Sequence, residues 1–239
     1  MPEKSSLNVR LIDCVGYIVP SSLGYIENEQ PRMVKTPWFE EEIPFNMAAE
    51  IGTEKVITEH STIGLVVTTD GSITEIPRDE YEEAEERVIN ELKEINKPFV
   101  MILNSLTPES ETVKALSVSL SEKYSVPVIP VNCLELSENE ITEILRSVLY
   151  RFPVSEICVE LPSWVMSLER EHWLRSSLSN SVKTSSESIN CVADIGSLLL
   201  GIETNEYINS ATINSIDLGK GTAKIGTALE GELFYKIIG

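Results

Sequence analysis

Apolar and polar residues follow two different periods along the first part of this chain. Residues 63–70 form a β-branched apolar run of the kind that is buried on both faces of a parallel sheet. Residues 79–96 instead place apolar side chains three and four positions apart, with acidic residues in the first turn, where the helix dipole favours them. The pattern predicts a strand followed by a helix.

The same alternation continues on both sides of this pair. Further strands are predicted at 98–104 and 126–131, and further helices at 45–60, 109–124 and 137–150. Strands that alternate with helices over short links are typical of a parallel sheet with right-handed crossovers. We therefore predict an α/β domain that occupies residues 1–150.

The remaining residues, 151–239, predict a smaller α+β domain. Its expected elements are a strand at 154–160, a mostly helical stretch at 164–195, and a strand pair at 207–218 and 222–229. Residues 176–188 are so rich in serine that a polar helix and a disordered linker are both open interpretations. No catalytic arrangement of residues is evident in this part.

A short apolar run near the start of the chain ends in Asp13-Cys14-Val15-Gly16. P-loop NTPases end the strand that faces their Mg²⁺ in this way. We expect a buried strand that brings Asp13 to its carboxyl end, where the carboxylate holds a Mg²⁺-bound water and the Gly16 N–H approaches a γ-phosphate. The alternative is an ordinary strand that ends in a turn.

The phosphate-binding loop of a P-loop protein is missing from the sequence. It reads Gly-x-x-x-x-Gly-Lys-Ser/Thr between a strand and a helix. The nearest string, residues 219–222, has Asn214 at the position of the first glycine, and we predict it to be a hairpin turn. Because this loop precedes Asp-x-x-Gly in P-loop proteins, we expect the chain to be truncated at its N-terminus.

Ligands of open α/β sheets bind at the carboxyl ends of the strands. The third such end here reads Asn104-Ser105-Leu106-Thr107, where GTPase-like proteins have Asn-Lys-x-Asp. The aspartate that accepts two guanine N–H groups is therefore absent, which predicts ATP as the nucleotide, contacted by Asn104 and Ser105. Alternatively, Asn104 only caps a turn before Pro108.

Composition restricts the partners. The 239 residues carry a formal net charge of −19, with 12 basic and 27 acidic side chains up to residue 150 and 7 and 11 beyond it. This balance argues against nucleic acid as a partner. No apolar run reaches the 18 residues of a membrane span and no signal peptide is present, so we expect a cytoplasmic protein. Four cysteines without a Cys-x-x-Cys motif and two histidines indicate neither a zinc site nor a disulfide framework.

Several unusual polar and aromatic strings extend over nearly the whole chain. They are Arg10–Tyr17, Pro31–Met33, Thr36–Trp38, Glu50–Thr53, Glu59–Gly64, Thr68–Gly71, Glu83–Ile89 and Leu161–Met166. Together they resemble the stage IV sporulation protein A family, morphogenetic ATPases of the bacterial endospore coat. The resemblance is specific, because these strings are not generic patterns of a fold.

The resemblance implies a fold, an activity and partners. Residues 1–150 would be the C-terminal part of a P-loop, GTPase-like ATPase domain, and residues 151–239 a middle α+β assembly domain. Family members bind and hydrolyse ATP with Mg²⁺, polymerise with copies of themselves, and recruit other coat proteins. They lie in the mother-cell cytoplasm at the forespore outer surface, where a small amphipathic peptide holds them at the membrane as peripheral proteins.

The resemblance also gives roles to residues. Asp13 would be the Walker B aspartate, both catalytic and metal-binding, and Gly16 would contact the nucleotide beside Asn104 and Ser105. Family members begin with a P-loop segment and continue beyond residue 239, so this chain alone is expected to be inactive. The second reading of the sequence is a purely structural protein-interaction module without nucleotide chemistry.

Overall fold

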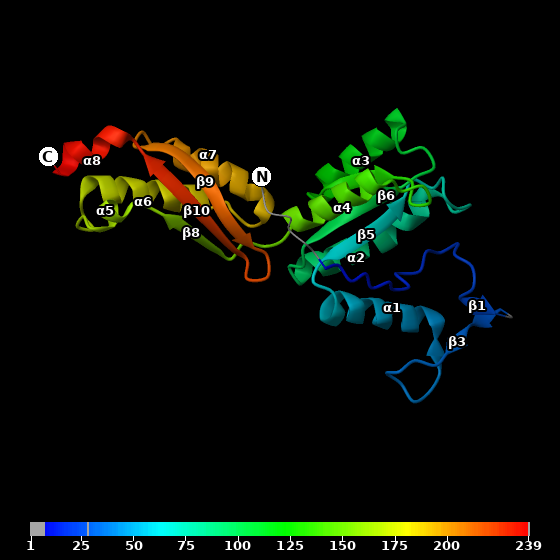
Figure 1. The fold of residues 1–239 in the computed structure, drawn as a ribbon. Coiled ribbons are helices and arrows are strands. Elements are labelled where there is room, and N and C mark those ends of the chain that lie inside the picture. Colours follow the sequence, from blue (N-terminus) through cyan, green and yellow to red (C-terminus); the bar gives the residue numbers. More distant parts are fainter. Residues whose placement is uncertain (1–7, 28, 239) are drawn as a thin grey trace. The chain divides into compact units, whose positions relative to one another are not determined.

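The computed structural model describes residues 8–27 and 29–238. It divides into two compact units, Met1–Leu145 and Arg146–Gly239, and each is described by itself. Within the described residues, no helix combines the length and the apolar character that crossing a lipid bilayer requires. Figure 1 shows the ribbon of both units, with many of their elements labelled.

The first unit is built on a parallel sheet of three strands in the order β5-β6-β7. The strands are β5 (Gly64–Thr69), β6 (Phe99–Asn104) and β7 (Val128–Val131), and all run in the same direction. Each strand is connected to the next through a helix. The predicted α/β fold with a parallel sheet, followed by a smaller second unit, is confirmed.

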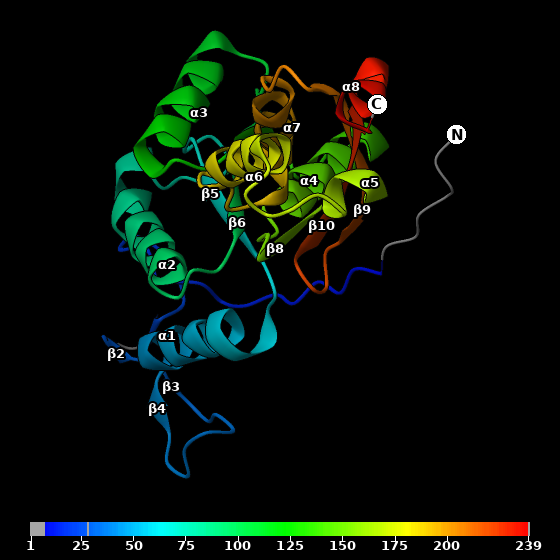
Figure 2. The ribbon, with the colours of Figure 1, turned by 90° about the vertical axis from the view of Figure 1, so that its left-hand side faces the viewer.

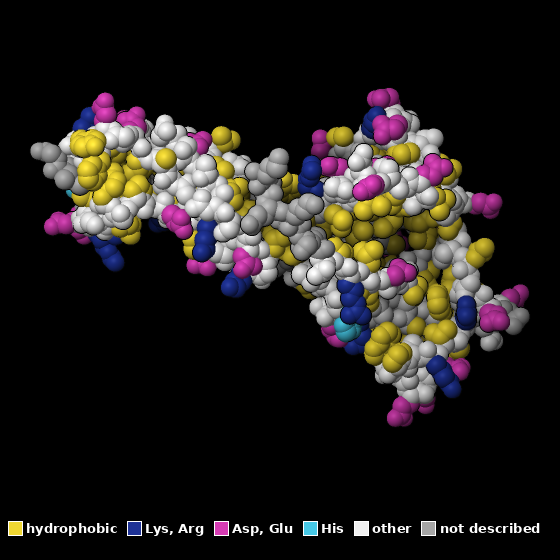
Figure 3. Space-filling view, viewed as in Figure 1, with side chains coloured by type: hydrophobic (Ala, Val, Ile, Leu, Met, Phe, Trp, Pro, Cys, Tyr) yellow, Lys and Arg dark blue, Asp and Glu magenta, His cyan; other side chains and the backbone are white. Residues whose placement is uncertain are grey.

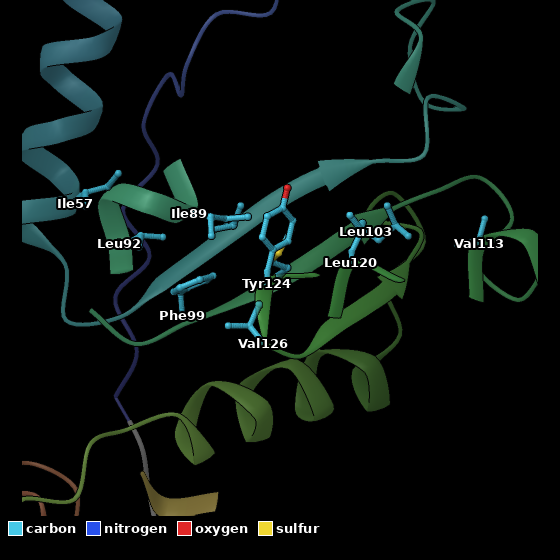
Figure 4. Packing of buried hydrophobic residues seen from close by; sticks show 11 residues of the cluster. Ile57, Ile89, Leu92, Phe99, Leu103, Val113, Leu120, Tyr124 and Val126 are labelled. Carbon is cyan, nitrogen blue, oxygen red and sulfur yellow. The ribbon is translucent and has the colours of Figure 1, made fainter. Parts of the chain in front are cut away.

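Helices cover both faces of this sheet. On one face, α2 (Glu82–Glu94) and α3 (Glu111–Tyr124) pack their apolar side chains onto β5 and β6, as Figure 4 shows. On the other face, Ile144 of α4 (Glu138–Tyr150) packs against β6 and β7. The apolar run of β6 is buried on both sides because it lies between these two layers. Each large side chain buried in this way contributes about 1.5–3 kcal/mol.

A smaller group of elements precedes the sheet. The helix α1 (Phe45–Lys55) continues into a π-helical turn, Val56–His60, which confirms the predicted helix over 45–60. Figure 2 shows short strands gathered near the start of α1. They are the antiparallel pairs β1 (Ile26–Glu27) with β2 (Gln30–Pro31) and β3 (Met33–Val34) with β4 (Ile43–Pro44).

The second unit is a mixed sheet covered by helices. Its strand order is β8-β10-β9, with β10 parallel to β8 and antiparallel to β9. The strands are β8 (Glu156–Glu160), β9 (Ile208–Asp217) and β10 (Thr222–Leu229). The predicted hairpin at 219–221 is confirmed: Gly221 takes a φ of +66°, which glycine adopts without strain.

Four helices complete the second unit: α5 (Ser163–Met166), α6 (Trp173–Ser186), α7 (Ile195–Glu203) and α8 (Gly231–Ile238). They contribute to one apolar core with the sheet, in which Val165, Leu174, Leu178, Leu198, Ile202 and Ile225 are fully buried. The serine-rich stretch is helical as far as Ser186, which supports the polar-helix interpretation over this part.

The stretch 164–195, predicted to be mostly helical, is divided between α5, α6, a 3₁₀ turn at Val192–Asp194 and the start of α7. The chain leaves α5 after Met166, and the Arg175 guanidinium binds the carbonyl oxygens of Met166 and Leu168 at 3.2 and 2.7 Å. His172 then starts α6, with its Nδ1 accepting a hydrogen bond from the Leu174 N–H. These two side chains satisfy backbone groups that a continuous helix would pair internally.

Candidate functional site

The carboxyl ends of the three parallel strands meet at one edge of the first unit's sheet. Thr69 of β5 lies beside Asn104 of β6, which lies beside Val131 of β7. Residues that directly follow these positions are therefore neighbours in space. This edge is where open α/β sheets bind ligands.

Asp70 joins two of the loops at this edge. Its Oδ2 accepts a hydrogen bond from the Ser105 Oγ at 2.7 Å, and its Oδ1 accepts from the Ser72 N–H at 2.9 Å and the Ser72 Oγ at 2.6 Å. Burial acts to raise the pKa of Asp70, but the hydrogen bonds from Ser72 and Ser105 outweigh it and hold that pKa below its usual value. Asp70 is a carboxylate at neutral pH.

Ser105 is fully buried at 0 % exposure. Its hydroxyl donates to Asp70 and accepts from the Thr107 N–H at 3.0 Å, while its own N–H donates to the Val131 carbonyl oxygen at 3.0 Å. All of these groups are used within the protein. Ser105 therefore shapes the loop after β6, and its predicted contact with a nucleotide would be made through that loop.

Asn104 ends β6 with its side chain turned to the next loop. The Asn104 Oδ1 accepts a hydrogen bond from the Cys133 N–H at 2.9 Å, and this backbone donor fixes the orientation of the amide. The Asn104 Nδ2 makes no hydrogen bond with any residue that the structure describes. The group of this amide that stays available is therefore a donor, whereas guanine recognition in the GTPase pattern requires an acceptor.

The segment that contains Asp13 differs from its prediction. Residues 8–16 form no strand, and Asp13 lies in an exposed, irregular stretch. The expected buried strand is therefore wrong. Apolar side chains of this stretch are open to solvent, with Leu11 83 % and Val15 66 % exposed. A strand requires a neighbour that pairs with its backbone, and among the described residues β5, at the edge of the sheet, pairs with β6 alone.

Gly16 is held in place by one side chain. It takes a φ of +79°, which glycine adopts readily, and its N–H donates to the Thr53 Oγ1 of α1 at 3.0 Å. The Asp13 carboxylate forms no hydrogen bond or ion pair with the described residues. Asp13 is thus an exposed, uncommitted carboxylate three residues before a fixed glycine.

A hollow of about 390 Å³ lies between this segment and the free edge of β5. Asp13, Gly16 and Thr53 line it together with both faces of β5. Figure 3 shows apolar side chains around a hollow on this unit. Leu65 and Val67 of β5 also line it and are 41 % and 57 % exposed. The structure thus brings Asp13 and Gly16 to one hollow and Asn104 and Ser105 to the strand ends. No hydrogen bond of the described residues connects the two pairs.

A buried ion pair near the end of β5 was not anticipated from the sequence. Glu85 of α2 is 4 % exposed and pairs with the Arg78 Nη2 at 2.8 Å. The Tyr124 hydroxyl donates to the Glu85 Oε1 at 2.9 Å, and the Arg78 Nη1 donates to the Thr68 Oγ1 at 3.4 Å. Burial, together with the hydrogen bond to Glu85, raises the pKa of Tyr124 to about 12.

The sequence carried a signal for this pair. Glu85 precedes Ile89 by four positions and Leu92 by seven, so it lies on the apolar face of its helix. A charged residue on such a face is buried only when it is paired. The Arg78–Glu85 pair therefore fixes α2 against the loop that follows β5.

Two family models match consecutive parts of the chain. The family model for the ATPase domain of stage IV sporulation protein A matches residues 1–153, and the model for the middle domain of the same protein matches residues 154–239. No solved structure gives a significant match to the chain.

Three curated relatives carry the name stage IV sporulation protein A. The protein of Bacillus anthracis is 48 % identical over 236 residues, which cover 99 % of this chain and 48 % of the relative. The protein of Bacillus subtilis (strain 168) is 48 % identical over 232 residues, with 97 % and 47 % covered, and that of Clostridioides difficile (strain 630) is 47 % identical over 233 residues, with 98 % and 48 % covered. The chain spans about half the length of these relatives. The chain belongs to the stage IV sporulation protein A family.

Proposed function

We propose that this chain is part of a spore coat assembly scaffold that binds and hydrolyses ATP, and that hydrolysis drives its polymerisation on the forespore surface. The match of residues 1–153 to an ATPase domain supports the chemistry. The names of the relatives support a role in sporulation. Polymerisation, place and partners follow from the resemblance of the sequence to the family.

One observation carries the assignment of the site. Within the part matched to the ATPase domain, Asp13 is exposed and has no partner among the described residues, and Gly16, whose N–H is bound to Thr53, lines the same hollow. Mg²⁺ in nucleotide enzymes retains water ligands and is bound by one or two carboxylates and by substrate phosphates. A single exposed carboxylate such as that of Asp13 suits a Mg²⁺ that is shared with ATP.

In this proposal the side chains of the chain have separate roles. Asp13 holds a water of the Mg²⁺, and Gly16 donates its N–H to a phosphate oxygen. Mg²⁺ supplies charge neutralisation to the transferred phosphoryl group when it is bound. Asn104 lies at the strand ends with its amide oxygen bound to the Cys133 N–H, and Ser105 and Asp70 hold the loop beside it. We propose ATP as the nucleotide.

The second region, residues 151–239, is proposed to make the contacts of assembly. Large apolar side chains stand exposed on its helices, with Tyr235 76 %, Leu200 69 % and Met166 53 % exposed. The proposed partners are further copies of the chain, a small amphipathic peptide that holds the polymer at the membrane, and other coat proteins. Removing residues 154–239 from the full-length gene product should leave ATP turnover in place and abolish sedimenting polymers. Normal polymers would contradict this assignment.

A second candidate function is a structural interaction module without nucleotide chemistry. One observation favours it: the sequence contains no Gly-x-x-x-x-Gly-Lys-Ser/Thr string, and this loop supplies most phosphate contacts in P-loop proteins. For the same reason we expect the present 239 residues alone to bind no ATP in calorimetry at millimolar nucleotide.

The test compares Asp13→Ala with Glu41→Ala in the full-length gene product that contains this sequence. Both remove one exposed carboxylate from the first unit. Asp13→Ala should lower Mg²⁺-dependent ATP turnover by about a hundredfold or more and largely spare ATP affinity, since the metal acts mainly on transition-state charge. Glu41→Ala should turn over normally. Undiminished turnover in Asp13→Ala removes Asp13 from the site, and absent turnover in the unaltered protein favours the structural module.

A further inference from the structure

The backbone N–H of Gly16 is already occupied in this structure. It donates to the Thr53 Oγ1 at 3.0 Å, and Thr53 is 2 % exposed within α1. A buried threonine hydroxyl has a fixed position, because its rotamer is restricted by the branched Cβ and by the surrounding helix. The acceptor is therefore built into the fold.

The next residue is held at the same time by two helices. The Tyr17 hydroxyl donates to Glu91 of α2, and the Arg87 guanidinium lies over the Tyr17 ring at 4.2 Å from its centroid. Arg87 also binds Glu50 of α1 at 3.0 Å and Glu91 at 3.2 Å. Tyr17 is thus fixed between α1 and α2 through a cation–π contact and a charged hydrogen-bond network.

These contacts restrain the Asp13 segment only at its C-terminal end. The Asp13 side chain has no described partner, and the stretch before Gly16 is exposed. Thr53, Tyr17, Arg87 and Glu91 therefore act as one clamp, which we call the Gly16 clamp. It sets where the exposed carboxylate of Asp13 can reach.

A single N–H makes one strong hydrogen bond at a time. If Gly16 donates to a phosphate oxygen, as the proposed function requires, it must first leave the Thr53 Oγ1. We propose that Thr53 competes with the nucleotide for the Gly16 N–H, so that the Gly16 clamp holds the segment in its nucleotide-free position. This inference rests on the proposed function and adds to it the residue that opposes nucleotide engagement.

The competition predicts that removing the Thr53 hydroxyl strengthens ATP binding instead of weakening it. Thr53→Val keeps the shape of the buried side chain and removes the acceptor, so the Gly16 N–H is released. ATP·Mg²⁺ should then bind more tightly by about three- to tenfold, the equivalent of one net hydrogen bond. A residue that only supports the fold would weaken binding when it is altered.

Three further variants complete the set. Thr53→Ser keeps the hydroxyl and should match the unaltered protein. Tyr17→Phe keeps the ring against Arg87 and removes the bond to Glu91, so it should tighten binding by a smaller factor. Thr58→Val is the matched control, because Thr58 is exposed on the next turn and its hydroxyl bonds only the Glu54 carbonyl oxygen.

The first measurement needs no nucleotide. Amide hydrogen exchange by NMR on the 239-residue chain should show the Gly16 amide exchanging about tenfold faster in Thr53→Val than in the unaltered chain, Thr53→Ser or Thr58→Val. Equal exchange at Gly16 in all four would show that Thr53 does not hold it, and would overturn the proposal whatever the protein binds.

The second measurement is calorimetric binding of ATP·Mg²⁺ to the full-length gene product and its variants, each checked for unaltered thermal unfolding. Tighter binding in Thr53→Val and Tyr17→Phe supports the proposal. If the unaltered protein binds ATP and Thr53→Val binds it equally well or more weakly, the competition between Thr53 and the nucleotide is ruled out. The proposed function is then unaffected. Absence of ATP binding in the unaltered protein overturns both.

Discussion

Two regions of the first unit carry its candidate chemistry, and they are held in very different ways. At the strand ends, Asp70, Ser105 and Asn104 are joined across three loops by side-chain and backbone hydrogen bonds. At the hollow, Asp13 and Gly16 depend on the Thr53 contact and on the clamp around Tyr17. The strand ends thus form a hydrogen-bonded frame, whereas residues 13–16 are irregular and have one described side-chain hydrogen bond, from Gly16 to Thr53.

The largest loss of stability is expected from the buried Arg78–Glu85 ion pair, which lies near the strand ends. Glu85→Ala leaves the Arg78 guanidinium without its partner and should lower the free energy of unfolding of the first unit by about 3–5 kcal/mol. Glu86→Ala is the matched control on the same helix, because Glu86 pairs with Lys123 at the surface and should cost at most about 1 kcal/mol. Urea unfolding measures both. Equal losses would mean that the buried pair does not support the frame.

The sequence correctly predicted the strands of the sheet, but its predicted strand before Asp13 is wrong. The apolar run of β6 has partners on both edges, so its local pattern and its surroundings agree. Residues 8–12 have a similar pattern, but no strand pairs with them, and their backbone stays irregular. A periodic pattern states a preference, whereas a strand also requires a neighbour.

The sites show the same division. Asn104 and Ser105 could be placed at the carboxyl end of a strand, because the apolar run before them predicts β6. The bond from Gly16 to Thr53 joins residues 37 positions apart, and no spacing or composition announces it. The Arg78–Glu85 pair was partly predictable. The sequence places Glu85 on the apolar face of its helix, but it does not identify Arg78 as the partner.

The next effect concerns the nucleotide that the frame accepts. With the Asn104 acceptor bound to the Cys133 N–H and no aspartate in this loop, two guanine N–H donors find no charged acceptor. Such hydrogen bonds are worth about 2–3 kcal/mol, which favours ATP over GTP by about thirtyfold or more in the full-length gene product. Displacement of a fluorescent ATP analogue measures the ratio. Equal displacement by GTP would contradict this reading of the strand ends.

The smallest effect tests the hydrogen bonds that define the frame. Ser105→Ala removes the donor to Asp70 and the acceptor for the Thr107 N–H, and should lower the free energy of unfolding by about 1–2 kcal/mol. Asp70 keeps its bonds from Ser72, which limits the loss. Ser119→Ala, at an exposed position of α3, and Asp13→Ala should each stay within about 0.5 kcal/mol. If Asp13→Ala lowered the free energy of unfolding as much as Ser105→Ala does, the two regions would not differ in how firmly they are held.

The central claim is that the Asp13–Gly16 segment responds to nucleotide while the strand-end frame stays fixed. Amide hydrogen exchange of the full-length gene product, with and without ATP·Mg²⁺, tests it most directly. We expect faster exchange across residues 13–17 when ATP·Mg²⁺ binds, because the Gly16 clamp is then released. We expect exchange at the buried positions of β6 to stay the same. Unchanged or slower exchange across residues 13–17 in the presence of bound ATP would contradict the central claim.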